Sequence, residues 1–240
     1  MPVTILSETI KNPLSFMGQC AGIAYDSDTT DPEKNYKRGK QCVLDGHYRM
    51  LEFCDVFMEI DGYSIRVMRE FMRSVGDGLT VIQRSTRYCK ESNSEIYEPK
   101  SIANDFTAHT IFTDTFNYIM SGYEQLLNLG ISKEDASNLL PLGLHTKLAI
   151  KKNARNLSDM SAQRLCSRAL KEYRDLMKDI INALSSYSEE WKELCKMVMK
   201  CKCDKVGWCE EEFSCGKYLK KQDVMVVPIG KDSNPNEFDS

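Results

Sequence analysis

Hydrophobic and polar positions along the chain follow two periods, one typical of strands and one typical of helices. Residues 3–10 alternate with a period of two, which predicts a first strand. Apolar side chains over residues 14–24 recur at helical spacing instead, and the Asn12-Pro13 pair before them is typical of a helix start. The chain therefore begins with a strand followed by a helix.

The same two periods predict the rest of the chain. The polar residues 27–39 predict a linker, Asp61-Gly62 predicts a turn, and Ser-Lys-Glu-Asp at 132–135 resembles a capping box. Further strands are expected at 55–60 and 145–152, an edge strand or ordered tail at 223–229, and helices at 40–44, 64–74, 104–129, 154 onwards, 168–184 and 191–200. Strands mixed with long helices indicate an α/β or α+β fold.

Aromatic side chains recur at helical spacing within the longest predicted helix: Phe106, Phe112, Phe116 and Tyr123. Because large apolar side chains on one face of a helix need a partner surface, we interpret them as packing either in the core or between subunits.

Composition narrows the class of protein. With 240 residues the chain can form one or two domains, and its 42% hydrophobic and 28% charged residues are ordinary for a globular protein. A net charge of -3 gives no general attraction to nucleic acid, so any anion site has to be local. No apolar run approaches the roughly 20 residues that span a bilayer, and the N-terminus lacks the pattern of a signal peptide. We expect a cytoplasmic protein with no membrane or nucleic-acid partner.

The ten cysteines fall into two groups. Five are scattered singly, as buried free thiols usually are: Cys20, Cys42, Cys54, Cys89 and Cys166. The other five lie within 21 residues: Cys195, Cys201, Cys203, Cys209 and Cys215. Without a secretory signal, a disulfide framework is the less expected explanation. The last four do not have the paired Cys-x2-Cys spacing of a zinc site, so free thiols and one bound metal ion both stay open, and no metal ligand is assigned.

An arginine-rich stretch, residues 69–90, is the first candidate site. It begins as an amphipathic helix, breaks at Gly76-Asp77-Gly78 and resumes as a polar segment with β-branched residues. Arginine forks match phosphate oxygens and stay charged, so this helix-to-loop junction is a candidate phosphate site. The alternative is a solvated helix end with ordinary surface arginines.

Five short motifs in this chain resemble, in their order, those of the flavin-dependent thymidylate synthases. They are Gly46-His47 with Leu51-Glu52, Arg73, Ser85-Thr86-Arg87-Tyr88, Leu140-Pro141-Leu142-Gly143 and Asn153-Ala154-Arg155-Asn156-Leu157. The cysteine-rich tail is also similar to that of some members from anaerobic bacteria. The resemblance implies an α/β (α+β) fold with a mostly antiparallel sheet flanked by long helices, in a homotetramer. Residues 1–200 would form the catalytic domain and residues 201–240 a cysteine-rich tail.

The activity that this resemblance implies is the reductive methylation of dUMP to dTMP. In this family, reduced FAD accepts a methylene group from methylenetetrahydrofolate and passes it to C5 of dUMP, and NADPH reduces the flavin. The cofactor carries the redox chemistry, while the protein positions it and polarises the uracil. Active sites in the family are shared between subunits, which implies that much of the apolar surface of each chain is interface.

The resemblance also implies roles for individual residues. Cofactor binding falls on His47, Glu52, Arg73, Asn153, Arg155 and Asp159. Substrate binding falls on Glu70, Arg73, Gln83, Arg84, Ser85, Thr86, Arg87 and Arg164. Arg164 is the expected catalytic residue, because a fixed cation would stabilise the anion left when uracil N3 loses its proton. Glu172 and Arg174 match the end of the last helix motif, where a structural ion pair is expected.

Each of these residues has a structural alternative. His47 would otherwise be a helix-capping or core histidine. Asn153 and Arg155 could be the end of a strand and the cap of the next helix. Arg164 could belong to a solvated helix face together with Arg155 and Arg168.

The chain departs from the family pattern in the middle of the arginine-rich stretch. Ser74 and Val75 replace the signature's His and second Arg, and nine residues rather than seven separate Val75 from Ser85. Arg49 or Arg84 could supply a missing cation. These departures motivate an alternative function, a paralogue that keeps the fold and nucleotide or flavin binding without methyl transfer. A structural protein with no small ligand is a third class.

Overall fold

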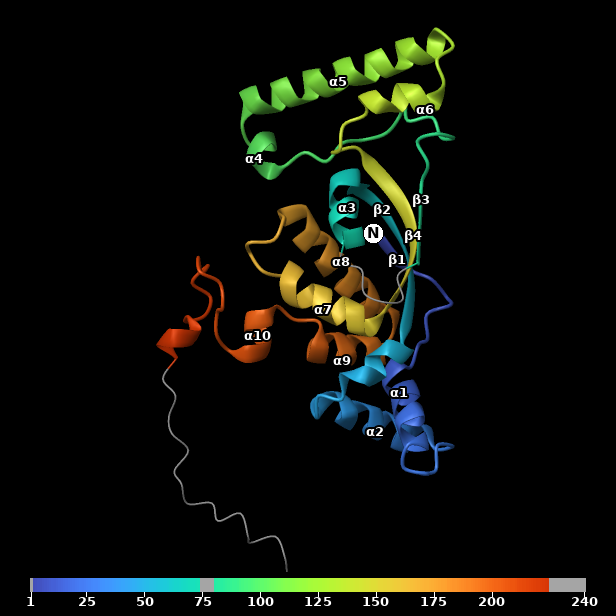
Figure 1. Cartoon of the computed structure of the whole chain (residues 1–240), viewed down its shortest axis with the longest axis vertical. Helices are drawn as coiled ribbons and strands as arrows, with labels where there is room; N and C mark the ends of the chain where they lie inside the picture. The colour runs from blue at the N-terminus through green and yellow to red at the C-terminus, as the bar shows by residue number, and fades with distance from the viewer. Residues whose placement is uncertain (1, 74–79, 225–240) are drawn as a thin grey trace, which may run out of the picture.

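The fold is built on a four-stranded antiparallel sheet (Figure 1). The computed structural model describes residues 2–73 and 80–224, and its strands lie in the order β1-β2-β4-β3. Their bounds are β1 Val3–Ile5, β2 Asp55–Ser64, β3 Thr80–Gln83 and β4 His145–Asn153. Every pair of neighbours is antiparallel. The sheet architecture that the motifs imply is thus confirmed.

Only one face of the sheet carries the hydrophobic core. In β2, Val56, Met58 and Ile60 are fully buried, as the alternation along a strand requires. On the opposite face, Lys151 of β4 pairs with Asp55 of β2, with 2.8 Å between Nζ and Oδ2. The helices gather on one side of the sheet (Figure 1), and this ion pair lies on the other side.

Helices from both halves of the chain cover the core face. They are α3 Ile65–Arg73, α7 Ala154–Arg164 and α8 Lys171–Tyr187, with α9 Glu189–Val198 packed against α8. Trp191 of α9 is fully buried, and its indole N–H donates to the carbonyl oxygen of Ile10 over 2.7 Å. The last helices thereby hold the segment that follows β1.

A buried carboxylate joins β2, α3 and α8. Glu172 is 2% exposed, and its two oxygens accept from the backbone N–H and the hydroxyl of Ser64, each over 2.7 Å. The same hydroxyl oxygen accepts from the backbone N–H of Val67 over 3.1 Å and so caps α3. The predicted ion pair between Glu172 and Arg174 is wrong: residues two apart on a helix point in different directions, and Arg174 donates to the carbonyl oxygen of Ala169 instead.

The N-terminal helices α1 Pro13–Ile23 and α2 Pro32–Leu44 form a tight hairpin. The predicted linker over 27–39 is wrong, because helix α2 begins inside it. Asp31 caps α2 by accepting from the backbone N–H groups of Glu33 and Lys34, and Pro32 is favourable in the first turn. The helix was not evident from apolar periodicity, since it packs through its backbone rather than through a hydrophobic stripe.

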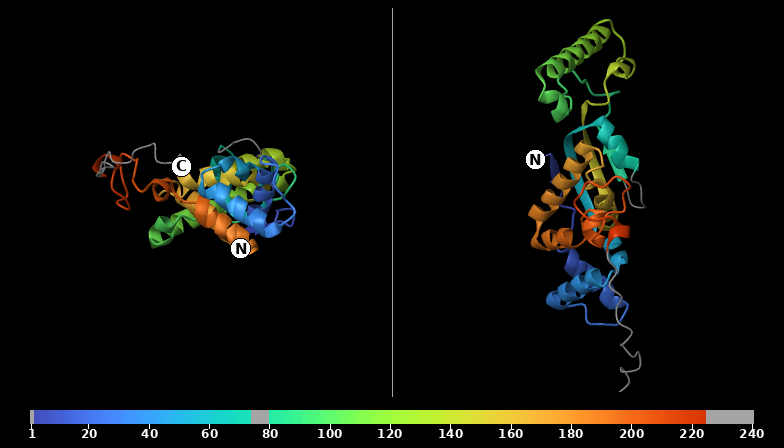
Figure 2. Two further views of the ribbon diagram at one scale, coloured as in Figure 1. Left: turned by 90° about the horizontal axis from the view of Figure 1, so that it is seen from below. Right: turned by 90° about the vertical axis from the view of Figure 1, so that its left-hand side faces the viewer.

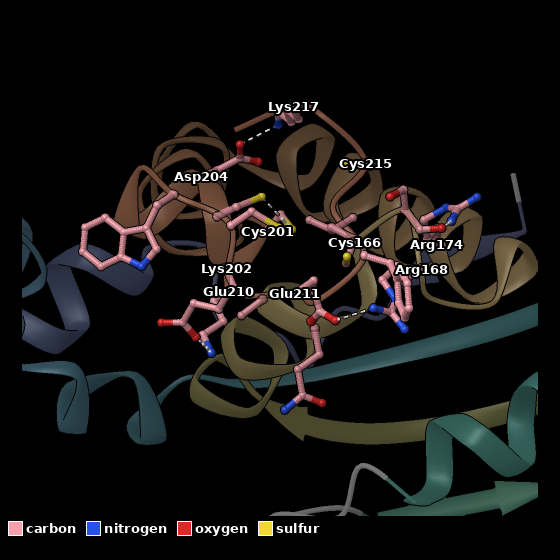
Figure 3. Close-up of a pocket in the computed structure, with 18 of the residues that line it drawn as sticks. Cys166, Arg168, Arg174, Cys201, Lys202, Asp204, Glu210, Glu211, Cys215 and Lys217 are labelled. Carbon is pink, nitrogen blue, oxygen red and sulfur yellow. Dashed lines mark hydrogen bonds and ion pairs between the residues drawn. The ribbon is translucent and has the colours of Figure 1, made fainter. Parts of the chain in front are cut away.

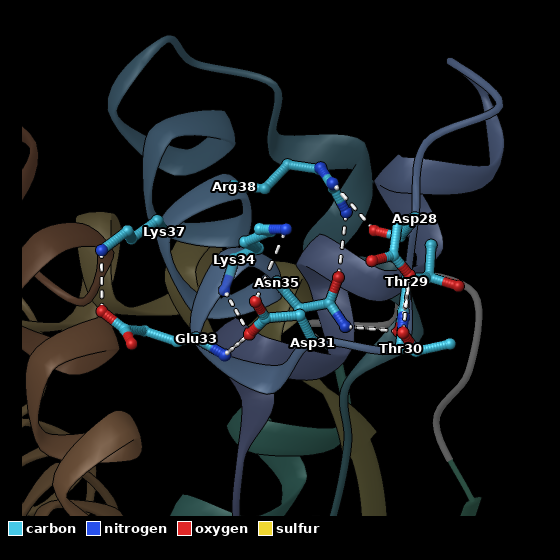
Figure 4. Close-up of polar contacts among 9 residues, drawn as sticks. All are labelled: Asp28, Thr29, Thr30, Asp31, Glu33, Lys34, Asn35, Lys37 and Arg38. Atoms are coloured by element: carbon cyan, nitrogen blue, oxygen red, sulfur yellow. Dashed lines mark hydrogen bonds and ion pairs between the residues drawn. The ribbon is translucent and has the colours of Figure 1, made fainter.

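Glycines allow this close packing. A Cβ at Gly18 would lie 1.8 Å from the carbonyl oxygen of Asn35, and one at Gly39 would lie 1.9 Å from that of Leu14. Arg38 of α2 then ties the two helices together, since its Nη1 donates to Gly18 O of α1 over 3.0 Å. The same atom donates to Asn35 Oδ1 within α2 over 2.9 Å (Figure 4).

A helical arm extends from the opposite end of the sheet (Figures 1 and 2). It comprises α4 Lys100–Ala103, α5 Phe106–Asn128 and α6 Lys133–Ala136, the last capped by Ser132 as predicted. Of the α5 side chains only Tyr123 is buried, while Phe106 is 86% exposed. Although α5 is 23 residues long, no helix within the described residues is apolar enough to cross a bilayer.

Two other local predictions are corrected. Strand β1 ends at Ile5 rather than at residue 10, because Thr9 N–H turns back to the carbonyl oxygen of Leu6. Asp61-Gly62 is a bulge inside β2 rather than a turn: Gly62 takes a φ of 78°, and the register with β4 shifts there. The segment predicted at 223–229 lies largely beyond the described residues.

One lysine lies inside the core. Lys152 of β4 is 0% exposed, and its Nζ lies 5.6 Å from the centre of the Phe71 ring. Burial lowers the pKa of Lys152 to about 8, because desolvation disfavours the charged ammonium. The native protein therefore holds this amine neutral above about pH 8.

The hairpin predicts that Gly39 tolerates no side chain. Gly39→Ala would place a Cβ 1.9 Å from a backbone oxygen, so it should lower the free energy of unfolding by about 1–3 kcal/mol. Gly122→Ala in α5 is the matched control, because the atom nearest to its new Cβ is 3.6 Å away. Urea unfolding of both variants and the wild type measures the effect. Equal stability of the two variants would contradict the packing described.

The buried lysine makes stability depend on pH with a definite sign. Unfolded, Lys152 stays protonated up to about pH 10.4, whereas folded it loses its proton near pH 8. Between these values the unfolded state binds more protons, so the stability of the wild type relative to Lys152→Met should rise with pH, by at most roughly 1.4 kcal/mol per pH unit. Chemical unfolding at a series of pH values tests this. A constant difference across the window would refute it, and Lys147→Met on the polar face should show no rise there.

Candidate functional site

A polar cavity lies where β4 ends and α7 begins. It has a volume of about 430 Å³ and is lined by Arg49, Glu52, Asn153, Arg155, Asn156 and Asp159. Four of these residues were predicted to bind the cofactor. The predicted residues on the two motifs, about 100 positions apart in the sequence, thus share one cavity.

The strand-to-helix junction positions this group. Asn153 is the last residue of β4, and its side-chain oxygen caps α7 by accepting from the backbone N–H of Asn156 over 2.9 Å. Asn153 is therefore the end of a strand and the cap of the next helix, as its structural alternative expected, and it also lines the cavity. Within α7, the Nε of Arg155 donates to Asp159 Oδ2, one turn further along, over 3.1 Å. The guanidinium of Arg155 lies 5.6 Å from the centre of the Tyr48 ring.

The opposite wall comes from the 3₁₀ helix Tyr48–Phe53, which carries Arg49 and Glu52. His47 precedes this helix, but its side chain makes no capping hydrogen bond and is exposed. Both structural alternatives for His47, capping and core, are therefore wrong. The residue lies next to the wall without lining the cavity.

A second group surrounds Arg164, at the far end of α7. Its guanidinium carbon lies 4.6 Å from the centre of the Tyr173 ring, and its Nη2 lies 3.9 Å from Glu70 Oε2. Arg73 in turn donates to Glu70 Oε1 over 3.1 Å. Three predicted residues, Glu70, Arg73 and Arg164, are thus brought together by α3 and α7.

Arg164 does not belong to a solvated face. Its side chain is only 26% exposed, and its Nε is buried with no hydrogen-bond partner among the described residues. A buried donor without an acceptor costs about 1–3 kcal/mol, so native proteins rarely keep one unless something else completes it. The arrangement is suited to an acceptor that comes from a ligand or another chain.

A third group lies where β3 leaves the sheet towards the arm. Gln83 donates to Thr146 Oγ1 over 3.3 Å, and Arg84 donates to the buried Glu91 over 3.0 Å, which raises the pKa of the arginine. The hydroxyl of Ser85 accepts from the backbone N–H of Arg87 over 3.3 Å. The guanidinium of Arg84 is therefore held by an ion pair within the chain.

The last two residues of this group occupy the turn after β3. Thr86 lies in the turn itself, and the Nη2 of Arg87 lies 3.0 Å from Glu134 Oε2 in α6. Both partners of this ion pair are more than half exposed, so it contributes little to stability. Arg87 could exchange Glu134 for another anion at small cost.

The three groups do not form one cavity within a single chain. The first two share helix α7, while the third lies at the β3 edge below the arm. Ser74 and Val75, the substituted signature positions, and Gly76-Asp77-Gly78 lie outside the described residues.

Sequence reasoning missed two side chains that support α7. Tyr173 lies against the guanidinium of Arg164, and Lys205 donates to the hydroxyl oxygen of Ser158 over 3.0 Å. Lys205 belongs to α10 Lys202–Val206, and burial lowers its pKa. Neither contact has a local sequence signal, since both partners are brought together only by the folding of distant segments.

The chain is similar to proteins of one family. A family model described as thymidylate synthase complementing protein matches residues 4–187. A flavin-dependent thymidylate synthase from Pyrococcus furiosus is 25% identical over 225 residues, which cover 87% of this chain and 89% of that protein. Another, from Sulfurisphaera tokodaii, is 31% identical over 136 residues, which cover 56% of this chain and 52% of that protein.

A solved structure has a similar fold. It is the crystal structure of a flavin-dependent thymidylate synthase from Helicobacter pylori complexed with FAD and dUMP. The alignment covers 81% of this chain and 99% of that chain, with a TM-score of 0.63 and 20% sequence identity. At this identity the likeness establishes the fold alone.

Because the Nε of Arg164 is buried without a hydrogen-bond partner among the described residues, we predict that Arg164 does not stabilise the fold. Arg164→Met removes a buried donor without a partner and keeps an apolar side chain against Tyr173, so the free energy of unfolding should stay the same or rise by about 1 kcal/mol. Arg38→Met is the matched control: it removes the hydrogen bond that joins α2 to Gly18 of α1 and one to Asn35 within α2, and it should cost about 1–3 kcal/mol. Urea unfolding compares them. A loss for Arg164→Met as large as that for Arg38→Met would contradict the prediction.

Proposed function

Because this chain belongs to the thymidylate synthase complementing protein family, we propose that it is a flavin-dependent thymidylate synthase. The reaction proposed is the reductive methylation of dUMP to dTMP with methylenetetrahydrofolate, FAD and NADPH. The family resemblance read from the motif order is confirmed by the match over residues 4–187. The observation that carries the proposal is the pair of sites on α7, a polar cavity at one end and Arg164 at the other.

The cavity at the start of α7 suits a flavin nucleotide. It brings two guanidinium groups, Arg49 and Arg155, together with the amides of Asn153 and Asn156. Guanidinium forks match phosphate and carbonyl oxygens, and amides can both donate and accept at the polar edge of a flavin ring. Arg49, Asn153 and Arg155 would hold FAD, and Glu52 and Asp159 would accept hydrogen bonds from it. When bound, FAD supplies the redox chemistry.

Arg164 is the residue proposed to act on the uracil. Its guanidinium stays charged at any pH of function and is partly buried, so an anion beside it is poorly screened by water. The unpaired Nε is a donor that a uracil oxygen or the ionised N3 could accept. Tyr173 and Glu70 hold the guanidinium in place before the substrate arrives, which favours stabilisation of the charge that develops during the reaction.

The nucleotide phosphate is proposed to bind at Ser85 and Arg87. These residues lie away from α7 in the same chain, so the proposal includes a homotetramer in which the turn of one copy approaches α7 of another. The exposed apolar side chains of α5, among them Phe106, Ile111 and Tyr118, support such an association. Arg87 would exchange its exposed partner Glu134 for the phosphate, at small cost.

The alternative is a paralogue that binds flavin or nucleotide without methyl transfer. The observation that favours it is the loss of the signature's His and second Arg at Ser74 and Val75. Arg49 lines the cavity and could replace one missing cation, whereas Arg84 is held by the buried Glu91. Of the two arginines that could supply a missing cation, Arg49 is therefore the one placed to do so.

Binding of FAD is the first test. Purified protein should be yellow, or should become so when FAD is added. Arg155→Gln should weaken FAD binding about 10- to 100-fold, through the loss of a charged hydrogen bond, with little change in stability because its partner Asp159 is exposed. Arg66→Gln, on the exposed side of α3, is the control and should bind FAD as the wild type does.

Turnover is the second test. The FAD-loaded protein should release tritium from C5-labelled dUMP in the presence of NADPH and methylenetetrahydrofolate, and Arg164→Gln should abolish the release while still binding FAD. A protein that binds FAD but releases no tritium would establish the paralogue. A protein that stays colourless and inactive even with added FAD would contradict both proposals.

A further inference from the structure

Five of the ten cysteines line a second cavity, on the tail side of α7. Its volume is about 680 Å³, and its sulfur-bearing residues are Cys166, Cys201, Cys203, Cys209 and Cys215. Figure 3 shows Cys166, Cys201 and Cys215 entering the cavity region from three separate segments of the chain. None of the residues that line the first cavity lines this one. The thiols therefore form a site of their own.

Two of these thiols are already in contact. The Sγ atoms of Cys201 and Cys203 are 3.5 Å apart, with the Cys203 thiol donating to Cys201 (Figure 3). A disulfide bond is about 2.05 Å long, so the two sulfurs would need to approach by only about 1.5 Å. Cys201 is buried and Cys203 is half-buried, so a reagent reaches Cys203 first.

The surroundings favour a dithiol over a metal centre. Among residues 2–73 and 80–224, no group of three or more His, Cys, Asp or Glu side chains is arranged to hold a metal ion. The carboxylates around the cavity are committed to cations: Asp204 to Lys217, Glu210 to Lys202 and Glu211 to Arg168. Of the five cysteines that line the cavity, Cys201 and Cys203 have their sulfur atoms in contact.

We propose that Cys201 and Cys203 form a reversible disulfide, which makes this cavity a redox modification site. The oxidant is a low-molecular-weight disulfide such as oxidised glutathione. The Cys203 thiolate attacks one of its sulfurs and releases one thiol, leaving a mixed disulfide. The Cys201 thiolate then attacks the Cys203 sulfur and releases the second thiol. Two protein thiols lose two electrons and two protons, and the oxidant gains them.

The chemistry of Cys203 sets how this site responds. Burial and the contact with Cys201 raise the pKa of Cys203 to about 11, with Asp204 raising it further and Lys217 opposing it. The thiolate is the nucleophile, so the first step should be slow at neutral pH and should accelerate roughly tenfold per pH unit below that pKa. The second step is intramolecular between sulfurs in contact, so the mixed disulfide should not accumulate.

The modification would act on the first turn of α10. Cys201 directly precedes this helix, and its carbonyl oxygen accepts from the backbone N–H groups of Asp204 and Lys205. Lys205 reaches from the same turn to Ser158 on α7. A bond between Cys201 and Cys203 therefore constrains the turn through which the tail contacts α7.

The test follows each sulfur in the full-length protein. Wild type, Cys201→Ser, Cys203→Ser and the control Cys42→Ser are incubated with oxidised glutathione and then analysed by intact mass and peptide mapping. Wild type and Cys42→Ser should each contain a Cys201–Cys203 link, which makes the peptides that carry these residues two hydrogens lighter and which a reductant cleaves. Cys201→Ser should instead keep one glutathione on Cys203. The exposed Cys215 reports that the reagent has access in every form.

Two results would overturn the proposal. One is wild-type protein in which Cys201 and Cys203 carry no mutual link while Cys215 has reacted. The other is stoichiometric zinc in protein purified under reducing conditions and released by a mercurial thiol reagent, which would make these cysteines metal ligands. Neither measurement uses FAD or dUMP, so the outcome is independent of the proposed activity.

Discussion

The buried carboxylate of Glu172 is the interaction on which the arrangement of the chain depends. Its two oxygens accept both donors of Ser64, at the point where β2 ends and α3 begins. A buried charge that loses its partners is costly, so this contact fixes where α8 lies relative to the sheet. From there, α3 presents Glu70 and α8 presents Tyr173, the two side chains that hold Arg164. The environment of the proposed catalytic cation is thus assembled around one carboxylate.

Helix α7 connects the proposed functional regions of the molecule. Its first turn forms a wall of the polar cavity, its last residue is Arg164, and Ser158 between them receives Lys205 from the tail. The helix begins immediately at the end of β4, with Asn153 serving both elements. Because a strand and a helix joined without a loop have little freedom, the position of the whole helix follows from the register of β4.

The parts of this structure that sequence predicts well are those whose causes are local. Ser132 caps α6, Asn153 caps α7, and Arg155 meets Asp159 because one helix turn separates them. Helix α2 escaped prediction because its packing rests on glycine backbone contacts rather than on apolar periodicity. The hydrogen bonds of Glu172 to Ser64, 108 positions away, have no local signal at all. In the proposed tetramer, the relation of the Ser85 turn to α7 depends on how copies associate, which the sequence pattern of one chain does not contain.

The helical arm is joined to the rest of the chain near the C-terminal end of α5. Tyr123 is buried, and its hydroxyl accepts from the backbone N–H of Glu91, whose side chain holds Arg84 beside the Ser85 turn. At about 1.5 Å per residue, the exposed Phe106 lies roughly 25 Å from Tyr123. Phe106, at the tip of the arm, is therefore far from the contact that joins the arm to Glu91 and, through it, to Arg84.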